Sequence, residues 1–323
     1  MLTIGLDVGG TSVRAGVVDQ RGTVLDTARA ATPRGEGPLE DAITGVIEEL
    51  RARHRVMAVG LAVAGFVSAD QRTVQFAPHL AWRNAPVAER MSERLGLPVV
   101  LEHDVNAAAT AEYRFGAARG ARVAVMISLG TGIGGALLID GETYRGAHGI
   151  APELGHLRLV PDGRPCPCGK RGCWERYCSG TALVTTTLEM LAEHPEASGV
   201  LAREAAVDPA SITGRRVAAA AREGDPVAQR ALAGLARWLG EGLALVADIY
   251  DPEVVVIGGG VSESASLFLD KAREHYASVL TGAGYRPLAR IRRAQLGDDA
   301  GIVGAASLAR DLVLAEWADE RVG

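Results

Sequence analysis

One short pattern occurs twice in this sequence: a strand, a turn of Gly and Thr, a second strand and an acid-containing turn. The two copies cover residues 2–22 and 123–141. In the first copy, an apolar run leads into Asp7-Val8-Gly9-Gly10-Thr11, and apolar residues then alternate from 12 to 19. Alternation with a period of two is typical of a half-buried strand. Each copy is therefore predicted to form a glycine hairpin, and the repeat predicts two related domains.

The turn of the second copy also matches a dinucleotide-binding pattern. Gly130-Thr131-Gly132-Ile133-Gly134-Gly135 fits G-x-G-x-x-G. That fingerprint requires a helix after the glycines, because the helix N-terminus faces the pyrophosphate. Here residues 136–139 are Ala-Leu-Leu-Ile and run into a turn, which predicts a short strand. We therefore exclude NAD and FAD. A P-loop enzyme is excluded as well, because G-x-x-x-x-G-K-[ST] does not occur.

Helices and strands are predicted in the first half of the sequence, and the part after residue 180 is largely helical. Helices are predicted at 38–53, 86–95 and 106–115, and strands at 56–63, 98–102 and 254–257. A long helix opens at Asp225-Pro226, a favourable cap and first-turn pair, and ends at Asp251-Pro252. With a hinge near 116–122, we expect a small α/β domain over 1–116 and a larger one over 117–300.

Composition excludes several classes of protein. The chain has 323 residues, of which 48% are hydrophobic and 23% charged, which excludes a disordered chain or a coiled coil. The formal net charge is -5, and because proteins that neutralise phosphates are usually basic, we expect no nucleic-acid partner. Neither a targeting segment nor an apolar run of about 18 residues occurs. We therefore expect a cytoplasmic protein that makes no membrane contact.

The four cysteines lie close together in the sequence. Cys166, Cys168 and Cys173 form C-x-C-G-x-x-G-C, and His156 precedes them. Three thiolates and one imidazole suit tetrahedral Zn²⁺, and a site with four protein ligands is closed and structural. Buried free cysteines are the alternative, which this spacing disfavours. The fourth, Cys178, is interpreted as a small buried residue.

The first glycine turn could bind an anion. Gly9 and Gly10 allow a sharp turn that exposes backbone N–H groups, and Thr11 adds a hydroxyl donor. Asp7 at the strand end could hold a Mg²⁺ that bridges phosphates. An ordinary hairpin is the alternative. The second copy favours the phosphate interpretation, because two glycine turns from two domains can clamp one polyphosphate.

Three further acids are candidates for a site. Asp104 follows a strand and precedes a helix, where it could accept a hydroxyl proton or only cap the helix. Glu153 and Glu175 lie next to the proposed zinc ligands. Taken alone, each would be interpreted as solvated surface. Their positions suggest instead that zinc fixes the loop that carries them.

Three motifs in this order resemble the ROK family of repressors, open-reading-frame proteins and sugar kinases. They are D-x-G-G-T from Asp7, Glu153-Leu154-Gly155-His156, and C-x-C-G-x-x-G-C-x-E from Cys166 to Glu175. The resemblance extends over essentially the whole chain, and within the family it points to the actinobacterial type of ATP-dependent glucokinase. It implies transfer of a phosphoryl group from ATP to a hexose 6-hydroxyl, with D-glucose as the expected acceptor.

The resemblance also implies an architecture. The expected fold is a two-domain actin-like, ribonuclease-H-like α/β ATPase fold with a cleft between the domains. A C-terminal helix, 301–323, would complete the small domain, and the larger domain would carry the zinc loop. Sugar and ATP would be the small-molecule partners, with Mg²⁺ and a structural Zn²⁺ as metals. A homodimer or homotetramer is the expected assembly.

The resemblance assigns roles to individual residues. Asp104 would be the catalytic base. The residues expected at the sugar are His79, His103, Asp104, Glu153, His156 and Glu175. The residues expected at the nucleotide are Asp7, Gly9, Gly10, Thr11, Ser12, Gly130, Thr131, Gly132, Gly258, Gly259 and Gly260. The zinc ligands would be His156, Cys166, Cys168 and Cys173.

Three positions depart from the family pattern. The family usually has Asn where His103 and His79 stand, and often Lys where Ser12 stands. We hypothesise that His103 changes the acceptor preference or weakens glucose binding and adds a pH dependence; the alternative is a ring turned away, with water in its place. N-acetylmannosamine, fructose or allose could then be the acceptor, or polyphosphate the donor. A weakly catalytic sugar sensor is a further alternative. A repressor is not expected, because only six residues precede Asp7.

Overall fold

The structure is a computed structural model, and it describes residues 1–194 and 196–319. The chain divides into two compact units. Unit 1 contains residues 1–124, 136–152 and the described residues from 295 on, and unit 2 contains 125–135 and 153–294. Of the expected C-terminal helix, residues 320–323 lie outside the described part. No helix within that part is both long and apolar enough to span a membrane.

Unit 1 is built on a five-stranded sheet. Its strands are β1 (Thr3–Val8), β2 (Ser12–Val18), β3 (Val24–Ala31), β4 (Val59–Val63) and β8 (Val99–His103). Their order is β3-β2-β1-β4-β8. The first three strands are antiparallel, whereas β4 runs parallel to β1 and β8 parallel to β4. The predicted glycine hairpin is thus β1–β2, and parallel strands extend the sheet from it.

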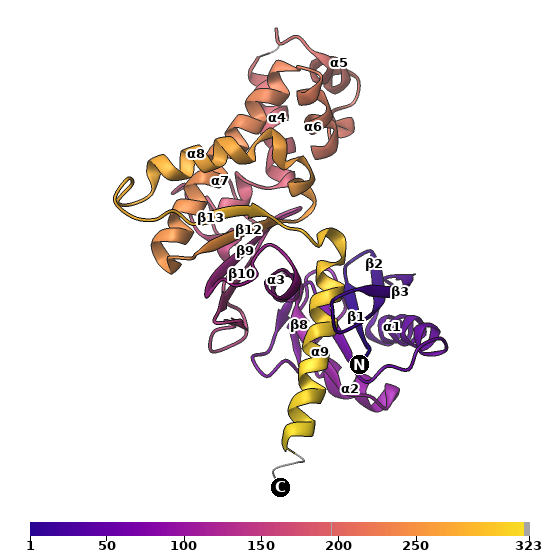
Figure 1. Cartoon of the computed structure of the whole chain (residues 1–323). Helices are drawn as coiled ribbons and strands as arrows, with labels where there is room; N and C mark the ends of the chain where they lie inside the picture. Colours follow the sequence, from indigo (N-terminus) through magenta and orange to yellow (C-terminus); the bar gives the residue numbers. More distant parts are fainter. Residues whose placement is uncertain (195, 320–323) are drawn as a thin grey trace. The chain divides into compact units, whose positions relative to one another are not determined.

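Helices pack on this sheet, and one of them approaches it closely. The helices of unit 1 are α1 (Glu36–Arg51), α2 (Val87–Leu95), α3 (Asp104–Phe115) and α9 (Ala300–Asp319). Figure 1 shows α9, in yellow, alongside β1 and α3, and it packs on both of them. A Cβ on Gly5 would collide with the carbonyl oxygen of Ile302, and one on Gly60 with that of Ala305. Glycine at these positions of β1 and β4 therefore allows the backbone of α9 to contact the sheet directly.

A small three-stranded sheet belongs to the same unit. It consists of β5 (Phe66–Val67), β6 (Val74–Phe76) and β7 (Arg83–Ala85), in the order β5-β6-β7. Both pairs are antiparallel. The loop between β6 and β7 carries His79, whose side chain is exposed.

A second five-stranded sheet repeats the plan of the first. Its strands are β9 (Val123–Leu129), β10 (Ile133–Ile139), β11 (Glu142–Thr143), β12 (Val254–Gly258) and β13 (Arg290–Arg293). The order is β11-β10-β9-β12-β13, which corresponds position by position to the first sheet. The repeat predicted from residues 2–22 and 123–141 is thus confirmed. The glycine pattern at 130–135 leads into strand β10, as expected, and not into a helix.

Apart from its share of this sheet, unit 2 is mainly helical. Its helices are α4 (Gly180–Glu193), α5 (Val200–Val207), α6 (Gly214–Arg222), α7 (Pro226–Tyr250) and α8 (Leu269–Val279). The predicted cap of α7 is confirmed, because the Asp225 carboxylate accepts hydrogen bonds from the Val227 and Ala228 amides at 2.9 and 3.0 Å. The polar stretch before α4 contains two 3₁₀ turns, Leu154–His156 and Trp174–Arg176.

Some bounds differ from those expected. The first helix covers 36–51 instead of 38–53, β4 begins at 59 and not 56, and α3 begins at 104 instead of 106. Residues 117–124 and 136–152, expected in the larger domain, lie in unit 1. The far end of the second hairpin packs there: Thr143 Oγ1 is 3.3 Å from Thr110 Oγ1, and the phenol of Tyr113 covers Gly141.

Candidate active site

The turn from β8 into α3 presents an imidazole beside a carboxylate. Asp104 is the first residue of α3, and His103 is the residue before it. Nε2 of His103 lies 3.0 Å from Oδ1 of Asp104. The same Oδ1 accepts a hydrogen bond from the Val105 amide at 2.8 Å. The His103 ring is thus directed at Asp104 and not away from it. The Asp104 carboxylate accepts no hydrogen bond from the amide two or three residues further along the chain. Such a bond would define a side-chain cap of the helix.

Asp7 is a second carboxylate in unit 1, at the end of β1. Its Oδ2 forms an ion pair with Nη2 of Arg14 at 2.8 Å, and that nitrogen also donates to the Asp298 carbonyl at 2.6 Å. Burial nevertheless raises the pKa of Asp7, an effect larger than the lowering by Arg14. The negative charges of Asp104 and Asp298 raise the pKa further. Asp7 and Asp104 therefore form an electronegative pair, which is the setting that attracts a divalent cation.

The first glycine turn is tight and exposed. The Gly9 amide donates to the Ser12 carbonyl at 3.1 Å, which closes the turn. Gly10 and Thr11 are exposed. A Cβ on Gly10 would lie 2.8 Å from the Cβ of His79, so the turn packs directly against the loop that carries that histidine. Two of the three departures from the family pattern, His79 and His103, thus lie at residues that border the candidate site.

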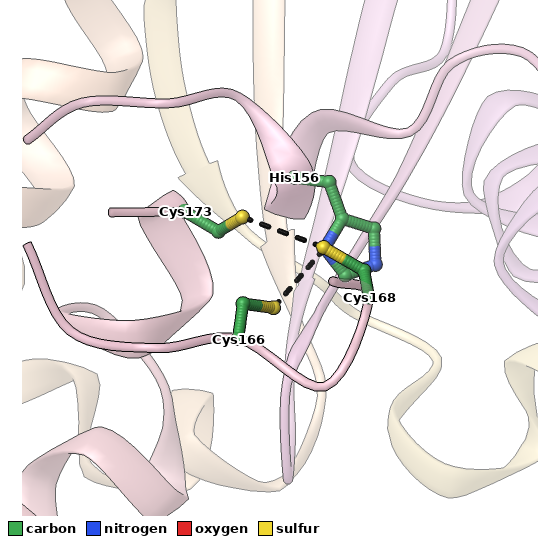
Figure 2. A group of neighbouring side chains, drawn as sticks. All are labelled: His156, Cys166, Cys168 and Cys173. Carbon is green, nitrogen blue, oxygen red and sulfur yellow. Dashed lines mark hydrogen bonds between the residues drawn. The ribbon is translucent and has the colours of Figure 1, made fainter. Parts of the chain in front are cut away.

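In unit 2, the predicted zinc ligands come together (Figure 2). One ligand atom each of His156, Cys166, Cys168 and Cys173 lies within 4.8 Å of all the others. Cys166 Sγ is 3.7 Å from His156 Nδ1, and the Sγ atoms of Cys168 and Cys173 are 3.6 Å apart. Cys178 is outside this group. It is fully buried, and its Sγ lies 3.8 Å from the Leu235 carbonyl oxygen.

Two carboxylates flank His156. Oε2 of Glu153 is 3.7 Å from Nε2 of the imidazole, and Oε1 of Glu175 is 3.8 Å from Nδ1. Glu175 Oε1 also lies 3.1 Å from Cys166 Sγ. A side chain on Gly132 would collide with Glu175 Oε2. Glu175 therefore joins the cysteine cluster to the second glycine turn within unit 2.

The second glycine turn borders a cavity of about 780 Å³. The Gly180 amide, at the start of α4, donates to the Gly130 carbonyl at 2.8 Å. The start of α6 lines the same cavity. Free N–H groups and the dipole make a helix N-terminus favourable for phosphate. The lining includes Gly130, Thr131, Gly180, Thr181, Thr213, Gly214 and Gly260.

The three glycines after β12 have different surroundings. Gly260 lines the cavity. Gly259 has φ 77°, and a Cβ there would lie 2.5 Å from the Leu129 carbonyl oxygen. A Cβ on Gly258 would lie 2.7 Å from the terminal methyl of Met126. Packing against β9 therefore explains Gly258 and Gly259, which we expected at the nucleotide, whereas Gly260 faces the cavity.

The helix starts that border this cavity were not predicted from the sequence. Ser179 Oγ accepts from the Ala182 amide and Thr213 Oγ1 from the Arg216 amide, both at 3.1 Å, so both residues are helix caps. A Ser or Thr before a Gly and a helical pattern is a recognised start signal. Glu102, a buried carboxylate next to His103, was also missed, because a single acid in a strand gives no signal of its partners.

Comparison with known proteins places the chain in a family. The model of the ROK family matches residues 3–312. The chain belongs to the ROK family. The resemblance inferred from the three motifs is thereby confirmed, and ROK membership explains why these motifs occur together in one chain.

Individual ROK proteins are similar over nearly the full length. A glucokinase of Streptomyces coelicolor is 46% identical over 310 residues, which is 96% of this chain and 98% of that protein. The crystal structure of a ROK glucokinase from Streptomyces griseus, in complex with glucose and AMPPNP, is also 46% identical; it covers 96% of this chain and 100% of its own, with a TM-score of 0.86. A ROK hexokinase from Thermus thermophilus is 33% identical, with a TM-score of 0.78 and 98% of this chain covered.

These structural matches confirm the fold class. The chain has the two-domain actin-like, ribonuclease-H-like α/β fold of ROK sugar kinases. The two glycine hairpins, β1–β2 and β9–β10, are the part of that fold that the sequence repeat had predicted.

Proposed function

We propose that this ROK protein transfers the γ-phosphoryl group of ATP to the 6-hydroxyl of D-glucose. The observation that carries the proposal is the 46% identity, over nearly the whole chain, to a ROK glucokinase that holds glucose and AMPPNP. The geometry supports it, because the chain offers a carboxylate at a helix start, two glycine turns and a cavity bordered by two helix N-termini.

Asp104 is the proposed base. Its carboxylate would accept the proton of the 6-hydroxyl as that oxygen attacks the γ-phosphorus, and the bond to the β-phosphate oxygen would break. Proton transfer of this kind contributes about 10²–10⁴-fold to a rate. In phosphoryl transfer, however, most of the catalysis comes from positioning and from charge stabilisation.

The glycine turns are the proposed phosphate contacts. Asp7, Gly9, Gly10, Thr11 and Ser12 in unit 1 would face the phosphates, as would Gly130, Thr131 and Gly132 in unit 2. The electronegative pair of Asp7 and Asp104 fits a Mg²⁺ ion held by carboxylates, which would neutralise charge on the phosphates when bound.

The nucleoside is proposed to occupy the cavity in unit 2. Its volume of about 780 Å³ lies within the range usual for small-molecule pockets, about 300–1,000 Å³. The starts of α4 and α6 would supply N–H donors to phosphate oxygens. Gly260 would allow the nucleoside a close approach, whereas Gly258 and Gly259 would act only by shaping the end of β12.

The sugar hydroxyls are assigned to six side chains. Carboxylates accept hydrogen bonds from hydroxyls, and a neutral imidazole can both donate and accept. The proposed set is His79, His103, Asp104, Glu153, His156 and Glu175.

A structural zinc ion is proposed for the cysteine cluster. Zn–S bonds of about 2.3 Å in a tetrahedron place two sulfurs about 3.8 Å apart. The 3.6 Å between Cys168 and Cys173, and the 3.7 Å between Cys166 and the imidazole, fit that requirement. His156, Cys166, Cys168 and Cys173 would fill all four positions, so the ion would order the loop that carries Glu153 and Glu175 and take no part in the chemistry.

We propose a cytoplasmic homodimer or homotetramer that binds neither nucleic acid nor membrane. The acidic net charge of -5 supports the absence of a nucleic-acid partner. Light scattering coupled to size exclusion measures the assembly, and a mass of one chain would contradict it.

A coupled kinase assay tests the activity. The purified protein is given glucose, N-acetylmannosamine, fructose or allose, each with ATP or with polyphosphate, and formation of the sugar phosphate is followed. We expect the highest kcat/KM for glucose with ATP. Turnover of another sugar alone would reassign the acceptor, and turnover with polyphosphate alone would reassign the donor. Sugar binding without turnover would identify a sensor.

A further inference from the structure

Glu102, directly before the His103–Asp104 turn, is a carboxylate with only 2% of its side chain exposed. It accepts five hydrogen bonds, all from within unit 1. Its Oε1 accepts from the His103 amide at 2.9 Å and from Asn106 Nδ2 at 3.0 Å. Its Oε2 accepts from Gln71 Nε2 at 3.1 Å. Oε2 also accepts from Nε and Nη2 of Arg145, at 2.8 and 2.5 Å.

Two of these donors lie on either side of Asp104 in the chain. The His103 amide belongs to the residue before Asp104, and Asn106 lies in the first turn of α3. One carboxylate oxygen therefore binds the chain before and after Asp104. Such a bond from a side chain to both arms of a turn fixes the direction in which the intervening side chain points.

Gln71 and Arg145 donate hydrogen bonds to the other oxygen, Oε2 of Glu102, from outside the turn. Gln71 has the left-handed backbone conformation, φ 60°, which is uncommon for a residue with a side chain. In that conformation its carbonyl accepts from the Leu101 amide at 3.0 Å, while its side chain reaches Glu102. The Arg145 carbonyl accepts from the Ala151 amide at 3.1 Å, so the same arginine holds the segment that leads to Glu153.

We propose that the Glu102–Arg145 ion pair is a positioning device for the base Asp104, and that it links the Asp104 turn to the segment preceding Glu153. The proposal rests on the proposed function for the role of Asp104, but the contacts themselves do not depend on it. A misplacement of about 1 Å at a reacting group can lower a rate about 100-fold, so loss of this pair should lower turnover beyond any effect that it has on folding.

The first test is Glu102→Gln, which keeps the shape but removes the charge and replaces one acceptor oxygen by an N–H donor. We expect kcat for glucose to fall about 10- to 100-fold, with a change in KM of less than about 3-fold. The matched control is Asp311→Asn, which breaks the Arg114–Asp311 pair in the same unit. The control should keep kcat. Equal losses in both variants, or an unchanged kcat in Glu102→Gln, would overturn the proposal.

The second test separates positioning from stability. Arg145→Met alone leaves a buried carboxylate without its cation and should lower the melting temperature, whereas the double variant Glu102→Gln/Arg145→Met should regain it. We expect kcat to stay low in the double variant. Recovery of kcat in step with the melting temperature would mean that the pair only stabilises the fold.

Hydrogen–deuterium exchange gives a readout that needs no turnover. In Glu102→Gln, the peptide containing the His103 amide should exchange faster than in the wild-type protein, while Asp311→Asn should leave it unchanged. If the wild-type protein phosphorylates no sugar, the proposed function fails, and this measurement still decides the positioning role. Unchanged exchange at His103 in Glu102→Gln would overturn it.

Discussion

Nε2 of His103 lies 3.0 Å from Oδ1 of Asp104, across the junction of β8 and α3. The imidazole of His103 therefore contacts the carboxylate that is the proposed base. Because an imidazole is larger than the Asn side chain usual at this position in the family, its nitrogens reach Asp104 where an amide group would be placed differently.

The substitution His103→Asn tests this contact. Asn keeps one donor and one acceptor but places them at different positions from the ring nitrogens. We expect a lower KM for glucose in the variant. Steady-state kinetics with glucose and its epimers measure this. Unchanged kinetics for glucose and its epimers would show that His103 does not set specificity.

Asp7→Asn is expected to lower turnover without lowering the stability of the fold. Burial raises the pKa of Asp7 above its ordinary 3.8, so the ionised carboxylate is less favourable in the folded chain than in the unfolded one. This cost is absent at pH values below the unfolded pKa and fully present above the folded one. At pH 7, Asp7→Asn should therefore keep or raise the melting temperature, while turnover falls.

Asp19 is the control for Asp7, because its pKa is shifted in the opposite direction. The Thr23 amide donates to its carboxylate at 2.9 Å and lowers the pKa of Asp19. Its contribution to stability is present above the unfolded pKa and is lost as the pH falls through the folded one. Asp19→Asn should thus lower the melting temperature at pH 7 and keep turnover. A loss of stability in Asp7→Asn, measured by calorimetry at pH 7, would contradict the prediction for Asp7.

Cys173→Ser should remove zinc. The closed site would contribute directly to folding, so the variant should also melt at a lower temperature. Elemental analysis of protein purified without chelator should give one zinc per chain for the wild type and less for the variant. The control Cys178→Ser lies outside the cluster and should retain the metal. Wild-type protein without zinc would refute the site.

Glu112→Gln should destabilise unit 1. The Glu112 side chain is fully buried, and its oxygens accept from the backbone amides of Ala117 at 2.7 Å, Gln295 at 2.7 Å and Leu296 at 2.8 Å. An amide would turn its own donor toward one of these N–H groups. We expect a loss of about 1–3 kcal/mol in the free energy of unfolding, the usual cost of an unsatisfied buried group.

Glu48→Gln is the matched control for Glu112. Glu48 pairs with Arg51 at 2.7 Å, but its side chain is 52% exposed. Surface pairs of this kind contribute about 0–1 kcal/mol. Urea titration of both variants measures the difference, and equal losses would mean that the Glu112 contacts do not stabilise the fold.

The features that could be predicted from the sequence depend on residues that are close together in the chain. The hairpins at Asp7 and Gly130, the cap at Asp225 and the cysteine cluster each depend on residues a few positions apart, so spacing and turn chemistry were sufficient. Glu102 could not be predicted in this way, because its partners Gln71 and Arg145 come from distant segments. The packing of Gly258 and Gly259 on β9 is equally non-local, and a glycine run alone does not distinguish packing from ligand contact.

Asp104→Asn tests the central claim most directly. The amide keeps the shape of the side chain but cannot accept the hydroxyl proton as a carboxylate does. Glucose affinity is measured by calorimetry and turnover by the coupled assay with ATP. We predict nearly unchanged glucose binding and a kcat at least about 100-fold below that of the wild type. A variant that phosphorylates glucose at close to the wild-type rate would show that Asp104 only begins the helix and is not the base.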